Sequence, residues 1–434
     1  MLKLFPSTAK INKGRLTIGG CDTVALAKEF GTPLYIFDEA TLRGRCSEYR
    51  KAFQKRYPDS TISYACKAYI NKALAQLFNE EGLSLDAVSA GEIAIAKETG
   101  FPMRRVYFNG NNKSRAELEE AVAWGVKYII VDNFHELSVL SDVAKKAKVQ
   151  QDVLLRLSPG IDPHTHAYLT TGNVDSKFGF LMSQAGDAVE TAMASKWLNL
   201  VGLHFHIGSQ LFDMKPYFKS IKVVVDFAAA MKRKNGFEMR MLVTGGGLGI
   251  AYLSDDEPPS VDDFAEMITS NVIKRCKTAK LELPHLVVEP GRSIVGQAGM
   301  ALYTVGAIKD IEGVRKYVLV DGGMSDNIRP SLYGAKYEAL IANKAVESGK
   351  AKTETVTIGG KYCESGDILI RDIDMPKIES GDIIAVPCCG AYCLSMASNY
   401  NASLKPPIVL VRDGKAKLIR RRETYKDLTK CDMV

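Results

Sequence analysis

Between about residues 60 and 290, short apolar runs rich in β-branched residues alternate with longer stretches of mixed polarity. The short runs predict strands at residues 61–66, 83–88, 105–109, 128–132, 153–157, 201–206, 241–244 and 285–289. The longer stretches place apolar residues three and four positions apart, which predicts amphipathic helices, for example at 72–80, 90–98, 114–124 and 135–148. Strands that alternate with helices indicate a parallel sheet, and about eight such units over roughly 230 residues fit an α/β fold of the (β/α)8 TIM barrel type.

A doubly wound α/β sheet is the competing architecture, and it usually carries one glycine-rich turn after its first strand. Here polar or unusual residues follow strand after strand: Lys67, Asp86, Asn109, Arg156, His206, Gly245 and Glu289. Barrel active sites are assembled in this way, from the carboxyl ends of several strands. The pattern therefore favours the barrel.

The sequence pattern changes after about residue 296, where short strand-like runs are broken by Gly, Asp and Pro. Closely spaced turn residues are typical of an all-β domain. The first 35 residues also contain strand-like runs, at 15–20 and 33–38. We therefore predict a TIM barrel over residues 36–296 and an all-β domain, a β-sandwich or β-barrel, formed by residues 297–434 and completed by residues 1–35.

Composition and charge narrow the class of protein. The chain has 434 residues, 46% hydrophobic and 25% charged, as in an ordinary globular protein of two or three domains. The net charge is +7, but the basic residues are scattered, so the stripe that nucleic-acid binding requires is missing. No run approaches the roughly 18 apolar residues of a membrane span.

The nine cysteines are odd in number and include no CxxC pair, which excludes a disulfide scaffold. The N-terminal residues lack the apolar segment and small-residue cleavage site of a secretory signal. A reducing cytoplasm is therefore the expected location.

Lys67 directly follows a predicted strand, so its amine is expected to project into the barrel mouth among residues that partly remove it from water. Partial desolvation favours the neutral, nucleophilic amine, which can form a Schiff base with an aldehyde cofactor. A lysine just past a strand is, taken alone, more often an ordinary surface residue.

Two further segments follow strands. The glycine-rich segment at 245–249, with Thr244 before it, can turn backbone N–H groups toward an anion such as a phosphate, although a flexible turn has the same composition. Glu289 and Arg292 stand three apart in EPGR. A buried Glu could keep a pyridine nitrogen protonated and an Arg could bind a carboxylate, or the two could form a structural salt bridge.

His204 and His206 lie on one face of a predicted strand, because strand side chains alternate. Neither the nearby acids nor the second histidine pair, His164 and His166, has the spacing of a metal ligand set. Ring stacking or core packing is the favoured interpretation, and no metal is predicted.

In the β domain, Cys363 and Glu364 share a turn, where a thiol could donate a proton and a carboxylate could bind an amine. A single loop cysteine is more often inert. Cys388, Cys389 and Cys393 suggest zinc, but a CC dipeptide does not supply the usual loop ligands, and structural thiols are favoured.

These segments and several others occur in a fixed order: YACKA around Lys67, SAGE at 89–92, HTHAYLTTGNVDSKFG at 164–179, HFHIGSQ, GGGLG, EPGR, RPSLYGA at 329–335, CESGD and GAY. In this order the chain resembles, over nearly its whole length, the barrel-type family of pyridoxal-phosphate amino-acid decarboxylases. The HTHxYxxTG segment followed by SKFG resembles the branch of that family that acts on diaminopimelate.

The resemblance implies that Lys67 bears pyridoxal 5'-phosphate through a Schiff base and that His206 stacks on its ring. The implied cofactor-binding residues are Lys67, Asp86, His206, Ser209, Gly246, Gly247, Glu289, Pro290, Gly291, Arg292 and Tyr392. The role of Asp86 among them is open. The implied substrate-binding residues are Arg292, Arg329, Tyr333, Glu364 and Tyr392.

The resemblance further implies two catalytic residues, Lys67 and the proton donor Cys363. Because Cys363 and Glu364 come from the partner chain in this family, it implies a homodimer with shared active sites. The implied reaction converts meso-2,6-diaminopimelate to L-lysine and CO2, the last step of lysine biosynthesis.

Three alternatives stay open at this point. A related decarboxylase could act on D-lysine, D-ornithine, L-ornithine or a carrier-bound amino acid, although ornithine decarboxylases tend to carry Asp where Glu364 stands. Alanine racemase shares the barrel and cofactor but places an arginine at the pyridine nitrogen, where this chain offers Glu289. A non-catalytic pyridoxal-phosphate carrier resembles the barrel alone and lacks the second domain.

Overall fold

The computed structural model describes residues 1–161, 176–345 and 352–433. The chain forms two compact units. The barrel unit comprises Cys46–Gly249 and Pro258–Gly291, and the second unit comprises Met1–Arg45, Ile250–Glu257 and Arg292–Val434. Within the described ranges, no helix combines the length and the apolar character needed to cross a membrane.

The barrel unit contains a closed parallel sheet formed by the predicted strands, which confirms the TIM barrel. The strands are β5 (Ser60–Ala65), β6 (Ser84–Ala87), β7 (Val106–Phe108), β8 (Tyr128–Val131), β9 (Gln151–Ser158), β11 (Leu198–Phe205), β12 (Met241–Val243) and β13 (His285–Val288). The sheet order is β9-β11-β12-β13-β5-β6-β7-β8, and β8 pairs with β9 to close the barrel. The two-residue strand β10 (Phe180–Leu181) pairs with the end of β9.

The barrel strands are apolar on both faces because one face packs inside the barrel and the other packs under helices. The interior cluster comprises Tyr107, Ile130, Leu154, Val201, Met241, Val243 and Val287. Buried layers of this kind fix the strand ends, so side chains that follow the strands are held at defined positions.

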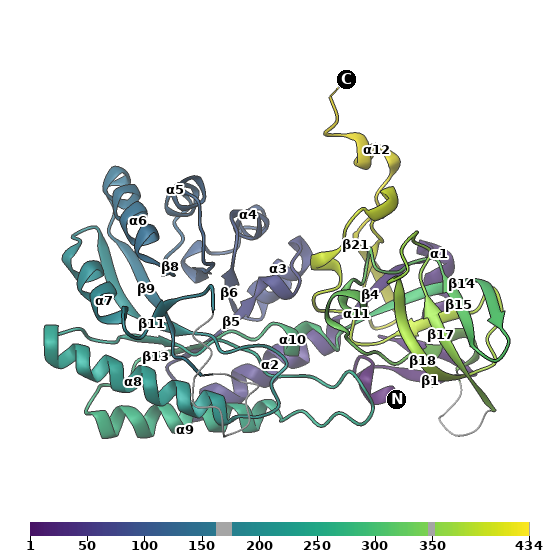
Figure 1. The fold of residues 1–434 in the computed structure, drawn as a ribbon, viewed down its shortest axis with the longest axis horizontal. Coiled ribbons are helices and arrows are strands. Elements are labelled where there is room, and N and C mark those ends of the chain that lie inside the picture. The colour runs from purple at the N-terminus through teal and green to yellow at the C-terminus, as the bar shows by residue number, and fades with distance from the viewer. Residues whose placement is uncertain (162–175, 346–351, 434) are drawn as a thin grey trace. The chain divides into compact units, whose positions relative to one another are not determined.

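Helices lie outside the barrel strands (Figure 1). They are α2 (Glu39–Arg56), α3 (Lys72–Glu80), α4 (Ala90–Glu98), α5 (Arg115–Ala123), α6 (Phe134–Ala147), α7 (Ala185–Ala194), α8 (Lys215–Asn235) and α9 (Val261–Ala279). Side-chain caps define several starts: Ser114 and Glu117 form a capping box at α5, and Asn133 accepts the Glu136 N–H at α6.

The second unit is built mainly from strands. They are β1 (Lys10–Asn12), β2 (Arg15–Ile18), β3 (Cys21–Asp22), β4 (Leu34–Asp38), β14 (Gly299–Ile311), β15 (Arg315–Val320), β16 (Leu340–Ile341), β17 (Thr353–Gly359), β18 (Ile368–Pro376), β19 (Ile383–Val386), β20 (Ile408–Arg412) and β21 (Lys415–Arg420). The larger sheet has the order β18-β17-β15-β14-β4-β20-β21, with β19 pairing both β14 and β16. β1, β2 and β3 form a separate small sheet.

The N-terminal segment completes this unit, as predicted. β4 lies between β14 and β20, antiparallel to the first and parallel to the second. The short helices of the unit are α1 (Thr23–Phe30), α10 (Arg292–Val295), α11 (Arg329–Tyr333) and α12 (Tyr425–Thr429). The core joins both ends of the sequence, since Leu16 and Ile36 pack in one cluster with Leu302 and Val409.

Candidate active site

A cavity of about 580 Å³ lies at the carboxyl ends of the barrel strands. Its polar lining includes Lys67, Asn109, Arg156, His206 and Glu289. Each of these residues lies within or follows a different strand, and sequence reasoning singled out all five positions. Active sites of TIM barrels occupy this end of the barrel.

Lys67 lies in a 3₁₀ turn, Cys66–Ala68, directly after β5. Its side chain is half-buried and lines the cavity. The backbone N–H of Ala65 donates to the Pro290 carbonyl at 3.0 Å, which ties this turn to the segment after β13. Gly291 packs there as well, since a Cβ on it would lie 3.1 Å from the Cβ atoms of Ala65 and Ala68. The Lys67 and 289–291 segments are therefore one packed unit.

Glu289 and His204 form a buried pair in the barrel, with Glu289 Oε2 at 3.1 Å from His204 Nε2. Burial raises the pKa of Glu289 to about 7, although nearby Lys67 and Arg156 oppose the rise. Burial, with a contribution from Arg156, lowers the pKa of His204 to about 3, so the imidazole is neutral. Glu289 Oε1 is buried and has no hydrogen-bond partner among the described residues.

Asp86, at the end of β6, lies beside this pair. Burial raises the pKa of Asp86 to about 7, and the neighbouring Glu289 adds to the rise. The Asn109 side-chain nitrogen donates to Asp86 Oδ1 at 3.2 Å and lies 3.4 Å from His204 Nε2. A connected set of buried polar groups therefore runs from Asp86 through Asn109 and His204 to Glu289.

The glycine run after β12 is shaped by close backbone contacts. A Cβ on Gly246 would lie 1.9 Å from the Glu289 carbonyl oxygen, so only glycine fits there. Gly247 has φ +112°, in the region that favours glycine. The Tyr217 hydroxyl donates to the Gly246 carbonyl at 2.7 Å. This anchored turn leaves backbone N–H groups available to bind an anion.

The loop after β11 carries two more predicted residues. His206 is half-buried and lines the cavity, and its buried Nδ1 has no partner within the described ranges. Burial lowers the pKa of His206 well below its ordinary value, so this ring is neutral and suited to stacking. Ser209 lies in the same loop and is exposed.

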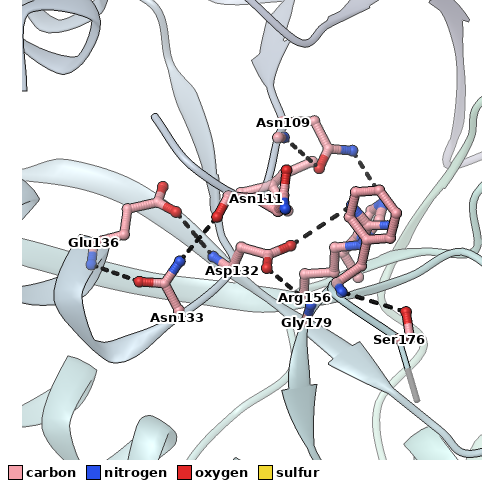
Figure 2. Close-up of polar contacts among 12 residues, drawn as sticks. Asn109, Asn111, Asp132, Asn133, Glu136, Arg156, Ser176 and Gly179 are labelled. Carbon is pink, nitrogen blue, oxygen red and sulfur yellow. Dashed lines mark hydrogen bonds and ion pairs between the residues drawn. The ribbon is translucent and has the colours of Figure 1, made fainter. Parts of the chain in front are cut away.

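Figure 2 shows Asp132, after β8, at the centre of a second polar network. Asp132 Oδ2 accepts the Gly179 N–H at 2.8 Å, and its Oδ1 lies 3.6 Å from the Arg156 guanidinium. Arg156 also stacks over the ring of Phe178, 4.4 Å from its centroid. Arg156 and Phe178 both line the cavity, so this network shapes one of its walls.

The SKFG end of the diaminopimelate-like motif is Ser176–Gly179, and it takes part in that wall. The rest of the motif, residues 164–175 with His164 and His166, lies outside the described residues. Within those that are described, no cluster of three or more His, Cys, Asp or Glu side chains could hold a metal ion.

The predicted substrate residues Arg292, Arg329 and Tyr392 lie in the second unit and share aromatic contacts. Arg292 Nη1 donates to the Tyr252 hydroxyl at 2.7 Å, and its guanidinium carbon lies 4.7 Å from the Tyr392 ring centroid. Arg329 is buried, with its guanidinium carbon 4.5 Å from the Tyr252 ring centroid. The rings therefore hold both guanidinium groups in place.

The remaining predicted residues of this unit are on its surface. Tyr333, at the end of α11, is 64% exposed. Cys363 and Glu364 are also exposed. Their turn is ordered by hydrogen bonds, because the Cys363 N–H donates to Asn401 Oδ1 at 3.0 Å and Glu364 Oε1 accepts the Gly366 N–H at 3.1 Å.

Sequence reasoning missed the supporting residues of both sets. His204 pairs with Glu289, although the sequence placed it only on the same face as His206. Tyr252 and Tyr337 support the two arginines, with Tyr337 accepting a hydrogen bond from Arg329. Cys388, Cys389 and Cys393 are buried, and the Cys393 thiol lies 3.6 Å from the Tyr337 hydroxyl. An isolated tyrosine carries no sequence signal for such a role.

Comparison with known proteins gives a consistent result. The family model described as "Pyridoxal-dependent decarboxylase, pyridoxal binding domain" matches residues 40–296. The chain is 46% identical to the diaminopimelate decarboxylase of Bacillus subtilis, over 97% of this chain and 95% of that protein.

Two solved structures extend the likeness to three dimensions. The diaminopimelate decarboxylase of M. jannaschii in complex with L-lysine matches with a TM-score of 0.92 and 37% identity, over 99% of this chain and 98% of the other. The enzyme of Helicobacter pylori complexed with L-lysine matches with a TM-score of 0.85 and 32% identity, over 94% and 98% of the two chains. The likeness therefore includes both units.

Proposed function

The chain belongs to the diaminopimelate decarboxylase family of pyridoxal-dependent decarboxylases, and from this membership we propose that it converts meso-2,6-diaminopimelate to L-lysine and CO2. The observation that carries the proposal is the 46% identity to a diaminopimelate decarboxylase over 97% of the chain. The enzyme is thus a carboxy-lyase of amino-acid biosynthesis.

The barrel cavity fits pyridoxal phosphate. Its volume of about 580 Å³ accommodates the cofactor together with part of a substrate. Lys67 offers an amine to the aldehyde. Glu289 Oε1, which has no hydrogen-bond partner among the described residues, offers an acceptor to a protonated ring nitrogen. The glycine turn at 245–247, where a Cβ would collide with neighbouring backbone, suits the close approach of a phosphate.

The bound cofactor supplies an electron sink that stabilises the carbanion left when CO2 departs. Lys67 would hold the cofactor covalently, and His206 would stack on its ring. Glu289 would hold the ring nitrogen in its protonated state, while Gly246, Gly247 and the 290–292 segment would bind the phosphate. Asp86 and Ser209 would complete the cofactor site, the first through its charge near Lys67.

Arg292 and Arg329 would bind a carboxylate of the substrate that is kept in the product, since a planar guanidinium matches a carboxylate in geometry. Glu364 would bind an ammonium group, and Tyr333 and Tyr392 would add hydrogen bonds. Cys363 would give the proton that replaces the lost carboxyl group on the substrate carbon. Separate clamps at both ends of the substrate orient the bond that breaks.

The same residues support a homodimer with shared active sites. Cys363, Glu364 and Tyr333 are exposed in the single chain, although each has a proposed role in binding or proton transfer. A partner chain that covered this surface would remove their side chains from water. We also propose a cytoplasmic location, because no disulfide links cysteines of the described chain and a reducing compartment keeps thiols in this state.

The direct test is a panel assay of CO2 release by the cofactor-loaded enzyme with meso-diaminopimelate, D-lysine, D-ornithine and L-ornithine. We expect meso-diaminopimelate to give the highest kcat/KM and the wild-type protein to show a Schiff-base absorption band that Lys67→Ala lacks. Preference for another substrate would replace the proposed one and leave the decarboxylase chemistry intact. Retained activity in Lys67→Ala would contradict the mechanism.

Shared sites have a separate test. Lys67→Ala and Cys363→Ala are each expected to lose nearly all activity. If Lys67 and Cys363 act in one site from different chains, mixed dimers of the two variants contain one intact site, and random mixing restores about a quarter of wild-type activity. No recovery in verified mixed dimers would place both residues in sites formed by a single chain.

A further inference from the structure

His204 is the buried neighbour of Glu289 and does not line the cavity itself. It projects from β11, is 0% exposed, and places its Nε2 at 3.1 Å from Glu289 Oε2. The other carboxylate oxygen, Oε1, has no partner among the described residues, while Glu289 as a residue lines the cavity. The two oxygens of Glu289 therefore have different surroundings, one held by protein and one available.

The surroundings of the imidazole determine which nitrogen carries its proton. The Asn109 amide nitrogen is a donor, because its Oδ1 accepts the Gly110 N–H at 2.9 Å, and it donates to Asp86 Oδ1 at 3.2 Å. It lies 3.4 Å from His204 Nε2, farther than Glu289 Oε2 at 3.1 Å, so the carboxylate is the closer partner of that nitrogen. His204 Nδ1 is buried without a partner in the described structure. A buried N–H without an acceptor is rarer than a buried acceptor without a donor. The neutral ring therefore carries its proton on Nε2, where Glu289 Oε2 accepts it.

We propose that His204 is a positioning residue for Glu289, whose Oε2 it holds by an Nε2–H hydrogen bond so that Oε1 is left for the ring nitrogen of the cofactor. This inference rests on the proposed function, in which Glu289 binds that nitrogen. His204 itself would touch neither substrate nor cofactor. Its role is to fix the rotamer of the carboxylate and to keep it ionised.

The charges around Glu289 and His204 explain why Glu289 needs a hydrogen-bond donor to stay ionised. Lys67 and Arg156 stabilise an anionic Glu289, whereas Asp86 repels it, and burial disfavours its charge. Asp132 is a further acid, and its charge acts on His204. Without the His204 donor, Oε2 would be a buried anionic oxygen lacking a hydrogen bond, which favours protonation of Glu289. A neutral, protonated Glu289 would stabilise the protonated ring nitrogen less than the Glu289 carboxylate does.

Two substitutions of similar polarity separate positioning from packing. The amide nitrogen of Gln lies about as far from the backbone as His Nε2, so His204→Gln retains the donor to Glu289. The amide of Asn corresponds instead to Nδ1, so His204→Asn loses it. His285→Gln is the matched control. His285 is the first residue of β13, the strand that Glu289 follows, so it lies at the opposite end of the barrel. There its Nδ1 pairs with Asp59 Oδ1 at 2.7 Å.

The measurements are the affinity for pyridoxal phosphate by equilibrium dialysis, the absorption spectrum of the bound cofactor against pH, and steady-state kinetics. We expect His204→Asn to lower kcat by about 10- to 100-fold with little change in KM, the loss typical of a buried charged hydrogen bond. It should also weaken cofactor binding and shift the titration of the bound ring to lower pH. His204→Gln should recover most of each effect, and His285→Gln should match the wild type.

The inference fails if His204→Asn has the wild-type spectrum and kcat, or if His204→Gln is as impaired as His204→Asn, which indicates a role in packing alone. If His204→Asn does not accumulate as folded protein, His204→Leu takes its place in the same comparison with His204→Gln. If the wild-type protein shows no cofactor band, the proposed function itself is wrong. That result differs from failure of the inference about His204, in which the wild type binds the cofactor normally.

Discussion

The ammonium group of Lys113 lies 2.7 Å from Glu136 Oε1, and each side chain is only 2% exposed. Lys113 also donates to the carbonyls of Gly110 and Ile130, and Glu136 Oε2 accepts the Asp132 N–H at 3.1 Å. The pair thus links the loop after β7 to the start of α6. Burial lowers the pKa of Lys113 and raises that of Glu136, so each ion depends on the other to stay charged.

Removing one ion of this pair is predicted to destabilise the barrel unit. Lys113→Met leaves the Glu136 carboxylate buried without its cation, and such a break costs about 3–5 kcal/mol. The double variant Lys113→Met/Glu136→Gln removes both charges and keeps an acceptor for the Asp132 N–H. We expect it to regain at least half of the loss in urea unfolding followed by circular dichroism. A double variant no more stable than Lys113→Met would contradict the ion-pair explanation.

The barrel and most of its candidate site could be predicted because their signals are local. The apolar runs and their spacing predicted each barrel strand, and helices at 72–80 and 90–98 coincide with α3 and α4. Lys67, His206 and Glu289 were visible because each follows a strand, and the ends of parallel strands meet at one end of a barrel.

Pairings between distant residues carried no such signal. Lys113 and Glu136 lie 23 positions apart and His204 and Glu289 lie 85 apart, so their contacts exist only once the barrel closes. The position of β4 between β14 and β20 likewise depends on pairing across more than 250 residues of chain. A hydrophobic pattern specifies which face of a strand is buried, but it does not specify which strand lies beside it.

Glu92 is predicted to make the folded state less stable at neutral pH than at acidic pH. Burial raises its pKa to about 7 from an ordinary value of 4.5, although the Val88 N–H donates to it. The penalty is absent below pH 4.5, where the carboxyl is protonated in both states. It grows between pH 4.5 and 7 and is complete above pH 7. Glu92→Gln should therefore gain about 1–3 kcal/mol at pH 8 and almost nothing at pH 4.5.

Thermal melting of the cofactor-free protein at several pH values provides the measurement. Glu117→Gln is the control of opposite sign. The pKa of Glu117 is lowered overall. Burial acts to raise this pKa, but the hydrogen bonds from Ser114 and Ala90 to the carboxylate outweigh the effect of burial. That carboxylate stabilises the fold above its unfolded pKa, so Glu117→Gln should lose stability at pH 8. An equal response of both variants to pH would contradict the assignment.

Tyr337→Phe is predicted to weaken substrate binding more than catalysis. The Tyr337 hydroxyl accepts a hydrogen bond from Arg329, which is the proposed clamp for a substrate carboxylate. Loss of this hydroxyl removes one restraint on the Arg329 guanidinium, while its stacking on the Tyr252 ring remains. We expect KM to rise by about 5- to 10-fold and kcat to stay within about twofold, as for an interaction made equally in ground and transition states. Tyr57→Phe, which loses a buried hydroxyl bonded to the Pro284 carbonyl, should leave KM unchanged.

Gly246→Ala is predicted to abolish tight cofactor binding. The added Cβ would lie 1.9 Å from the Glu289 carbonyl oxygen, so the glycine turn and the 289–291 segment must move apart. Both segments carry proposed cofactor contacts, and a displacement of about 1 Å is enough to lose them. The affinity for pyridoxal phosphate should fall by at least about tenfold in equilibrium dialysis. Gly44→Ala, where nothing lies within 4 Å of the new Cβ, should bind as the wild type does.

Asp132 is predicted to hold the 176–179 segment against the cavity through a single hydrogen bond. Its Oδ2 accepts the Gly179 N–H at 2.8 Å, and Gly179 packs closely on the β9 backbone, since a Cβ there would lie 3.0 Å from the Arg156 carbonyl oxygen. Asp132→Ala removes this acceptor together with the charge 3.6 Å from Arg156. Asp132→Asn keeps an acceptor for Gly179 and removes only the charge.

Hydrogen exchange of the peptide that contains Gly179 separates the two contributions. Loss of a buried hydrogen bond costs about 1–3 kcal/mol, so Asp132→Ala should speed exchange of that amide by about 5- to 100-fold, because local opening becomes easier. Asp132→Asn should retain most of the protection, since its side-chain oxygen can accept the same N–H. Exchange that is equally faster than in the wild type in both variants would assign the ordering of this wall to the attraction between Asp132 and Arg156, because both variants lack that charge. Wild-type exchange in both variants would contradict a role of Asp132 in ordering the wall.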